Sequence, residues 1–197
     1  SFSMKLWETD AVPQLQSIAK DGLMFTRFYA NSFRTDRGLV AILSGFPAQP
    51  TMSLMKYPKK TANLPSIARH LKEAGYGTKY YYGGDADFTN MRSYLVSQGI
   101  NDIVSDMSFP VKDRMSKWGV PDDKLFERLK ADLKDDRIGT PMLRIIQTSS
   151  SHEPFDVPYN RLADERLNAF AFADSCVGNF VSALKASPQW KNSLVIL

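Results

Sequence analysis

The sequence has few cysteines, few histidines and no long apolar segment. Its single cysteine, Cys176, cannot form a disulfide within the chain, and its apolar, helix-patterned surroundings predict a small buried thiol. His70 falls on the polar side of an amphipathic helical pattern, so we expect it at the surface. No run approaches the roughly 18 apolar residues of a membrane-spanning helix, and no such span is predicted.

The chain also lacks the features of a nucleic-acid-binding protein. Its formal net charge of +4 comes from 25 Lys and Arg scattered among 21 Asp and Glu residues, and no basic stripe with interleaved aromatic residues stands out. We therefore expect a solvated surface of mixed charge and no nucleic-acid partner. Linkers rich in Gly, Ser or Pro are missing too, so 197 residues with 43% hydrophobic content are predicted to form one domain.

Apolar periodicity predicts alternating helices and strands. The first predicted helix is capped by Asp10, has Pro13 near its first turn and runs to Lys20. The other predicted helices cover residues 35–44, 64–74, 88–98, 122–135 and 163–186, and the predicted strands cover 23–30, 78–82, 142–148 and 193–197. Such alternation is typical of an α/β fold with a mostly parallel central sheet and helices on both faces.

Both ends of the sequence look interrupted. Residues 1–7 carry no helix or strand start signal, and the predicted strand 193–197 stops inside an apolar run. Because strands at the edge of a fold need partners, we expect a single partial domain over residues 1–197, truncated at both ends.

One segment between a predicted strand and a predicted helix has the residues for chemistry. Residues 31–38 read Asn-Ser-Phe-Arg-Thr-Asp-Arg-Gly, and they place Thr35 at a helix start between Arg34 and Arg37. Backbone N–H groups and the helix dipole stabilise negative charge at such a position, and a bound metal ion can deprotonate a hydroxyl there. The alternative is that Thr35 or Ser32 only caps the helix and that both arginines are solvated.

Residues 31–47, which read NSFRTDRGLVAILSGFP, resemble the nucleophile region of the lipoteichoic-acid-synthase branch of the alkaline phosphatase superfamily. In that branch a threonine coordinates a divalent metal ion and attacks the phosphorus of a phosphoglycerol lipid headgroup. The resemblance implies that Thr35 is both nucleophile and metal ligand, with manganese or magnesium as the cofactor. It also implies a catalytic domain on the extracytoplasmic side of a bacterial cytoplasmic membrane, attached through an N-terminal region that is missing here.

The same resemblance accounts for the two ends of the sequence. Residues 1–3 are similar to those that follow a metal-binding glutamate in this family, and residues 194–197 resemble the strand that leads to a metal-binding Asp-His pair. The resemblance thus implies that the remaining metal ligands lie outside the 197 residues.

His152 is a candidate substrate-binding residue. It follows the predicted strand 142–148, so it is expected beyond the carboxyl end of a parallel strand, where ligands gather. A lone loop histidine is otherwise most often solvated. In the family that the sequence resembles, a histidine in a similar His-x-Pro-Phe setting contacts the substrate phosphate and can donate a proton or a hydrogen bond to it.

Asn90 and Arg92 are two further candidates for binding the substrate. They lie where the synthases carry a Trp-Asn-Arg cluster that holds the glycerol-phosphate headgroup. Asn90 matches the Asn, but Thr89 and Met91 replace the Trp and the Arg, and Arg92 comes one residue late. A one-residue shift rotates a helical side chain by about 100°. The identity of the substrate is therefore left open.

Two other segments resemble parts of the family that we expect to be architectural. Residues 118–122 match a Trp-Gly-x-x-Asp pattern, and residues 172–178 resemble a Tyr-x-Asp helix with a following Gly. Packing and capping are the expected roles of Trp118 and Asp174.

The leading hypothesis is a metal-dependent phosphotransferase or hydrolase that acts on a membrane-lipid phosphoglycerol headgroup or an envelope glycan. A sulfatase is the alternative enzyme, since the same fold hydrolyses sulfate esters. The type-I signature of Cys or Ser followed by x-Pro-x-Arg is absent, because Val-Gly-Asn follows Cys176. A non-catalytic extracellular binding domain is the alternative from another class.

Overall fold

The computed structural model describes residues 4–135 and 140–197, which group into two compact units. The sheet unit consists of Phe25–Pro110 and Pro141–Gln147. The helical unit consists of the described residues of Phe2–Met24, Val111–Thr140 and Thr148–Leu197. Each unit has a cluster of buried apolar side chains of its own.

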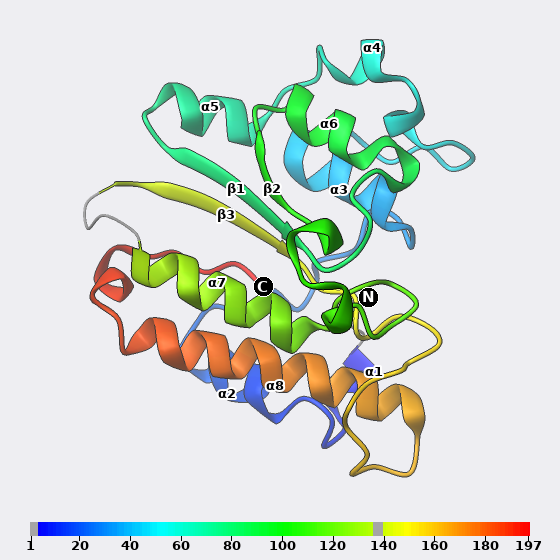
Figure 1. Cartoon of the computed structure of the whole chain (residues 1–197), viewed down its shortest axis with the longest axis vertical. Coiled ribbons are helices and arrows are strands. Elements are labelled where there is room, and N and C mark those ends of the chain that lie inside the picture. The colour runs from blue at the N-terminus through cyan, green and yellow to red at the C-terminus, as the bar shows by residue number, and fades with distance from the viewer. Residues whose placement is uncertain (1–3, 136–139) are drawn as a thin grey trace. The chain divides into compact units, whose positions relative to one another are not determined.

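The sheet unit is built on parallel strands. Within the described residues the sheet has three, in the order β2-β1-β3, formed by β1 (Gly77–Tyr82), β2 (Asp102–Val104) and β3 (Met142–Gln147). Strand β1 lies between β2 and β3 (Figure 1). Its Tyr80 pairs with Ile103 on one side and Ile145 on the other. The predicted α/β class with a parallel sheet is confirmed. Strand β2 is so short that its apolar pattern did not reveal it.

The sheet unit also contains short helices. They are α3 (Thr35–Ser44), η1 (Leu54–Lys56), α4 (Pro58–Thr61), α5 (Ile67–Glu73), η2 (Phe88–Asn90), α6 (Met91–Ser97) and η3 (Asp106–Ser108). Leu43 of α3, Tyr80 of β1 and Leu95 of α6 belong to one buried cluster, so the core joins helices to the central strand. Helix α5 begins at Ile67, three residues later than predicted, because proline disfavours helical backbone at the residue before it and Ser66 caps the helix instead.

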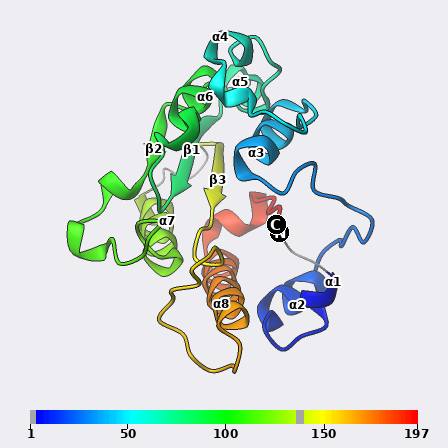
Figure 2. The same cartoon turned by 90° about the vertical axis from the view of Figure 1, so that its right-hand side faces the viewer.

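The helical unit is organised around one long helix, α8 (Glu165–Lys185). The other elements are α1 (Met4–Trp7), α2 (Pro13–Lys20), η4 (Val111–Asp113), α7 (Asp122–Asp135) and η5 (Pro188–Asn192). Helix α8 packs against both α2 and α7 (Figure 2). The rings of Phe126 and Phe180, whose centroids are 5.5 Å apart, join α7 to α8.

The contact between α2 and α8 explains the residue types at positions 174 and 178. Asp174 accepts hydrogen bonds from the backbone N–H groups of Gln14 at 2.9 Å and Leu15 at 2.8 Å, so a side chain of α8 caps the start of α2. A Cβ atom at Gly178 would lie 2.5 Å from Gln14 Cγ, closer than real contacts allow. The expected capping role of Asp174 is therefore what the structure shows.

Two predicted strands and part of one predicted helix are wrong. In the part of the chain that the structure describes, residues 23–30 and 193–197 form no strand. Their side chains are strongly exposed, with Phe28 at 83% and Leu194 at 86%. An apolar extended segment becomes a strand only where its backbone N–H and C=O groups meet a partner strand. The predicted helix 88–98 is broken after its first turn, because Thr89 and Asn90 adopt positive φ values of 56° and 62°.

Helix α8 is more apolar than the sequence analysis recognised. By length and composition it could cross a membrane, yet 56% of its most apolar window is buried inside the protein, as in the core helix of a folded unit. Cys176 on this helix is buried as predicted, and burial raises the pKa of its thiol to about 12.

Candidate functional site

Thr35 is the first residue of α3 in the sheet unit. The preceding Arg34 is the N-cap residue, with φ −109° and ψ 134°, and within residues 4–135 and 140–197 no side chain caps this helix. Arg37 N–H bonds to the Arg34 carbonyl at 3.2 Å. The N–H groups of Thr35 and Asp36 therefore lack an acceptor within the helix. The predicted helix start is confirmed, whereas the alternative that Thr35 or Ser32 caps the helix is not.

The surroundings of Thr35 suit an anionic ligand. Its side chain is exposed, and its hydroxyl has no hydrogen-bond partner among the described residues. Arg34 Nε lies 3.3 Å from Asp36 Oδ1, and Arg37 Nη1 donates to the Pro50 carbonyl at 2.6 Å. Arg37 Nε is buried and unpaired within the same described set. The uncapped helix start therefore leaves backbone N–H groups next to an exposed hydroxyl, in a segment that also carries Arg34 and Arg37.

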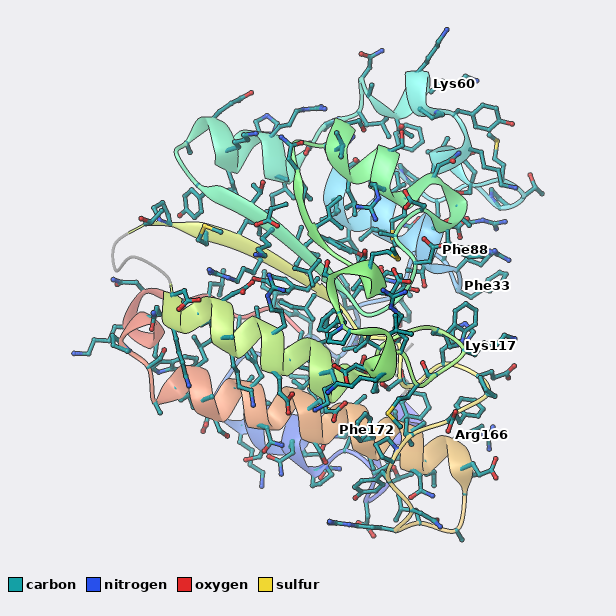
Figure 3. All side chains as sticks on the ribbon, in the orientation of Figure 1. Phe33, Lys60, Phe88, Lys117, Arg166 and Phe172 are labelled. Carbon is teal, nitrogen blue, oxygen red and sulfur yellow. The ribbon has the colours of Figure 1, made fainter. Side chains whose placement is uncertain are left out.

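The segments on either side of α3 are tied together. Asn31 Oδ1 accepts the N–H of Ala48 at 2.6 Å, which joins the chain before the helix to the chain after it. Gly45 ends the helix in the left-handed region, with φ 62°, and its N–H bonds to the Ala41 carbonyl. Phe33, two residues before Thr35, is 87% exposed and projects from the sheet unit in Figure 3.

Asn90 and Arg92 lie beyond the carboxyl end of β1. Arg92 Nε is paired with Asp87 Oδ1 at 2.8 Å, and Arg92 Nη2 lies 3.5 Å from the Oγ of Ser105, the residue that follows β2. Arg92 is thereby held at the carboxyl edge of the sheet. Asn90 is exposed, and it is the N-cap residue of α6.

The structure brings some of the predicted site residues into one unit but does not join them directly. Element η1 contacts both α3 and η2, so the regions of Thr35 and Asn90 belong to one packed body. In the described chain, no hydrogen bond or ion pair links the Thr35 side chain to Asn90 or Arg92. His152 belongs to the helical unit, and its sharing a cleft with Thr35 stays a prediction.

His152 is exposed in the loop that precedes α8. Its ring lies against Trp118, with centroids 4.4 Å apart at 57°, and its Nδ1 is 3.0 Å from the Glu153 carbonyl oxygen. Trp118 Nε1 donates to the same carbonyl. Because a carbonyl only accepts, the hydrogen lies on Nδ1 and Nε2 is the nitrogen left for a ligand. Lys117, labelled in Figure 3, has its Nζ 5.7 Å from the Trp118 ring centroid.

Asp122, the buried first residue of α7, is the residue that sequence reasoning missed. Its Oδ1 accepts the Ser149 N–H at 2.9 Å, its Oδ2 accepts the Ser150 N–H at 3.2 Å, and its own N–H donates to Ser150 Oγ at 2.9 Å. Burial raises the pKa of Asp122 to about 6, so the carboxyl group is ionised at neutral pH. The Trp-Gly-x-x-Asp resemblance drew attention to this segment. The hydrogen-bond partners of Asp122 could not be predicted, because they lie 27 and 28 residues further along the chain.

Metal ligands were expected only at Thr35 within this chain. Among residues 4–135 and 140–197, no three His, Cys, Asp or Glu side chains gather closely enough to hold an ion.

The family model described as Sulfatase matches residues 1–197, which is the whole chain. The chain belongs to the sulfatase family. A curated relative of this sulfatase-family chain is phosphoglycerol transferase I from Xanthomonas axonopodis pv. citri, which is 24% identical over 210 residues. That match covers 94% of the chain and 30% of the relative. The chain thus spans less than a third of the relative's length.

Two solved structures agree with this assignment. An alkaline phosphatase superfamily protein from Vibrio parahaemolyticus matches with a TM-score of 0.84 and 30% identity, over 95% of this chain and 48% of that one. The lipoteichoic acid synthase LtaP from Listeria monocytogenes matches with a TM-score of 0.79 and 18% identity, over 91% and 47% of the two chains. The resemblance to the alkaline phosphatase superfamily that the sequence suggested is confirmed.

Proposed function

We propose that this sulfatase-family chain supplies the nucleophile of a phosphotransferase that acts on the phosphoglycerol headgroup of a membrane lipid or on an envelope glycan. The observation that carries the proposal is the exposed, unbonded hydroxyl of Thr35 at the uncapped start of α3. The similarity to a phosphoglycerol transferase supports phosphorus as the atom attacked.

In the proposed reaction, Thr35 Oγ loses its proton and attacks phosphorus in line, an Oγ–P bond forms, and the P–O bond to the lipid breaks, so that the lipid leaves as an alcohol once its oxygen takes up a proton. The result is a phosphothreonine intermediate that carries the glycerol phosphate. Attack on phosphorus by an acceptor hydroxyl or water then breaks the Oγ–P bond and returns the proton to Thr35. The N–H groups of Thr35 and Asp36 and the guanidinium of Arg37 stabilise the charge that develops on the phosphoryl oxygens. Thr35 is thus assigned the covalent step.

His152, Asn90 and Arg92 are the residues that we assign to substrate binding. His152 donates from Nε2 to a phosphate oxygen when its ring is an imidazolium, because its Nδ1 is engaged by the Glu153 carbonyl. Arg92 offers a guanidinium fixed by Asp87, and Asn90 offers an exposed amide next to it. Charge-assisted hydrogen bonds of this kind suit a phosphate group.

The cofactor and the location are further parts of the proposal. A divalent cation, manganese or magnesium, is the proposed cofactor of the full-length protein, with Thr35 as one of its ligands. Thr35 is the one metal ligand that we assign within this chain. We place the catalytic domain on the extracytoplasmic side of a bacterial cytoplasmic membrane, in the cell envelope.

Sulfate-ester hydrolysis is the second candidate, and the Sulfatase family model favours it. It would use the same threonine, because the only cysteine, Cys176, is buried in α8 and its pKa is raised. Thr35 Oγ would then attack sulfur in place of phosphorus.

The direct test uses the full-length protein with added manganese. Release of glycerol phosphate from phosphatidylglycerol is measured beside hydrolysis of an aryl sulfate, for the wild type and for Thr35→Ala. We expect Thr35→Ala to reduce glycerol phosphate release to background, since the covalent step is lost. Thr51→Ala, which removes another exposed threonine of the sheet unit, is the matched control and should be unchanged. Activity that survives Thr35→Ala contradicts the assignment, and activity on the sulfate alone favours a sulfatase.

A further inference from the structure

A chain of hydrogen bonds connects the start of α7 to the backbone of His152. The Asp122 carboxylate accepts the N–H of Ser149, and the Ser149 carbonyl accepts the N–H of His152 at 3.0 Å. The His152 carbonyl in turn accepts the N–H of Phe155 at 2.9 Å. All of these residues belong to the helical unit. Ser149 is therefore bonded both to Asp122 and to the backbone of His152.

The imidazole itself is held from a second direction. Trp118, four residues before Asp122, packs its ring on His152 and donates its Nε1–H to the carbonyl that also engages His152 Nδ1. One five-residue segment thus holds the histidine at its backbone through Asp122 and at its ring through Trp118.

The Asp122 carboxylate is buried and fully hydrogen-bonded. Asp122 is fully buried, and placing a charge there is unfavourable unless hydrogen bonds compensate. Its oxygens are both used by the loop, and its own N–H is used by Ser150 Oγ. A group that is so completely engaged fixes the geometry of its partners closely.

We propose that Asp122 is a positioning residue for His152: its carboxylate sets the loop conformation in which the imidazole presents Nε2 to the substrate. The catalytic part of this idea rests on the proposed function of His152. The positioning part does not, because it concerns the histidine in the absence of substrate. The two parts can therefore be tested separately.

The helical unit contains a close control for this idea. Asp174 is also a buried carboxylate that accepts two backbone N–H groups, those of Gln14 and Leu15, at a helix start. Asp122→Asn and Asp174→Asn make the same change, since an amide keeps one acceptor and turns the other into a donor. Only Asp122 is bonded to the loop that carries His152.

The first experiment measures the imidazole ¹H–¹⁵N signals of His152 by NMR in the 197-residue chain. We expect Asp122→Asn to shift or broaden these signals, and Asp174→Asn to leave them at their wild-type positions. Unchanged His152 signals in folded Asp122→Asn, or equal changes in both variants, overturn the proposal. If Asp122→Asn does not fold, Ser150→Ala takes its place, because it removes the acceptor of the Asp122 N–H and should shift the same signals.

The second experiment is a double-mutant cycle in the full-length protein, with glycerol phosphate release as the readout. We expect Asp122→Asn to lower kcat/KM by up to about 100-fold, as misplacement of a reacting group does, and to have no further effect in a His152→Ala background. Additive losses overturn the positioning role. If His152→Ala alone leaves activity intact, the proposed function of His152 fails, while the NMR result still decides the positioning.

Discussion

Helix α3 of the sheet unit begins differently from helices α2 and α8 of the helical unit. In the sheet unit, α3 begins without a side-chain cap and with an exposed threonine. In the helical unit, α2 is capped by Asp174 and α8 by Asp164, whose side chain accepts the N–H groups of Arg166 and Leu167. Capped starts stabilise the fold, whereas an uncapped start keeps N–H groups available for a ligand. The difference distinguishes a candidate reaction site from the scaffold.

The largest expected effect is the loss of a cap. Asp174→Ala leaves two N–H groups at the start of α2 without their acceptor, so we expect the free energy of unfolding to fall by about 2–3 kcal/mol. Thr35→Ala removes no hydrogen bond and should change it by less than about 0.5 kcal/mol. Urea unfolding followed by circular dichroism measures both. Equal losses would remove the distinction between capped and uncapped starts.

A pH effect of intermediate size is expected at the start of α7. The pKa of Asp122 is raised from 3.8 to about 6, mainly by burial and slightly by the charge of neighbouring Asp123, while the N–H groups of Ser149 and Ser150 oppose the shift. The native state therefore binds the proton more tightly than the unfolded state, and the free energy of unfolding should fall as pH rises from about 4 to about 6. The expected decrease is on the order of 2 kcal/mol.

Asp122→Asn provides the reference for that measurement, because an amide does not titrate. The difference in unfolding free energy between the wild type and this variant should change across pH 4 to 6 and level off above it. The backbone amide signals of Ser149 and Ser150 should report the same transition by NMR. A difference that is constant with pH contradicts a raised pKa. Cys176 of α8, whose pKa Asp122 helps to raise, does not titrate in this range.

The smallest effect is expected for metal binding to the chain itself. Calorimetric titration of the 197 residues with manganese or magnesium should give only weak heats, since Thr35 is the single ligand we assign within them. Comparison with Thr35→Ala shows whether even that weak binding involves the hydroxyl. Tight, stoichiometric binding that persists in Thr35→Ala would place a metal site elsewhere in the chain.

Local signals predicted two helices to the residue and part of a third. Helix α2 ends at Lys20 as predicted, but it begins at Pro13, with Val12 and not Asp10 as its N-cap residue. Helix α3 covers 35–44 because Gly45 can take a positive φ. Helix α7 covers 122–135, with two acidic residues in its first turn. In each case the deciding residues are adjacent to the element, so their effect can be read from the sequence.

Features that depend on distant partners were not predictable in the same way. Residues 23–30 and 193–197 have the apolar pattern of strands, but pairing decides whether a strand forms. At the candidate sites, the local sequence pattern was enough to predict the helix start at Thr35. The ion pair between Arg92 and Asp87 was not predictable, because the sequence did not reveal the break in the chain before α6. The bonds of Asp122 to Ser149 and Ser150 join segments that no periodicity relates.

The Glu153 carbonyl links hydrogen bonding and charge at His152. With Nδ1 occupied by that carbonyl, a neutral imidazole leaves Nε2 as an acceptor, and Nε2 can donate only once the ring is an imidazolium. A ligand oxygen that receives a hydrogen bond there also meets a full positive charge. An anionic oxygen is favoured on both grounds, whereas a neutral hydroxyl or amide oxygen gains the bond without neutralising the cation. The Glu153 carbonyl, by binding Nδ1, thus favours an anionic ligand over a neutral one at Nε2 of His152.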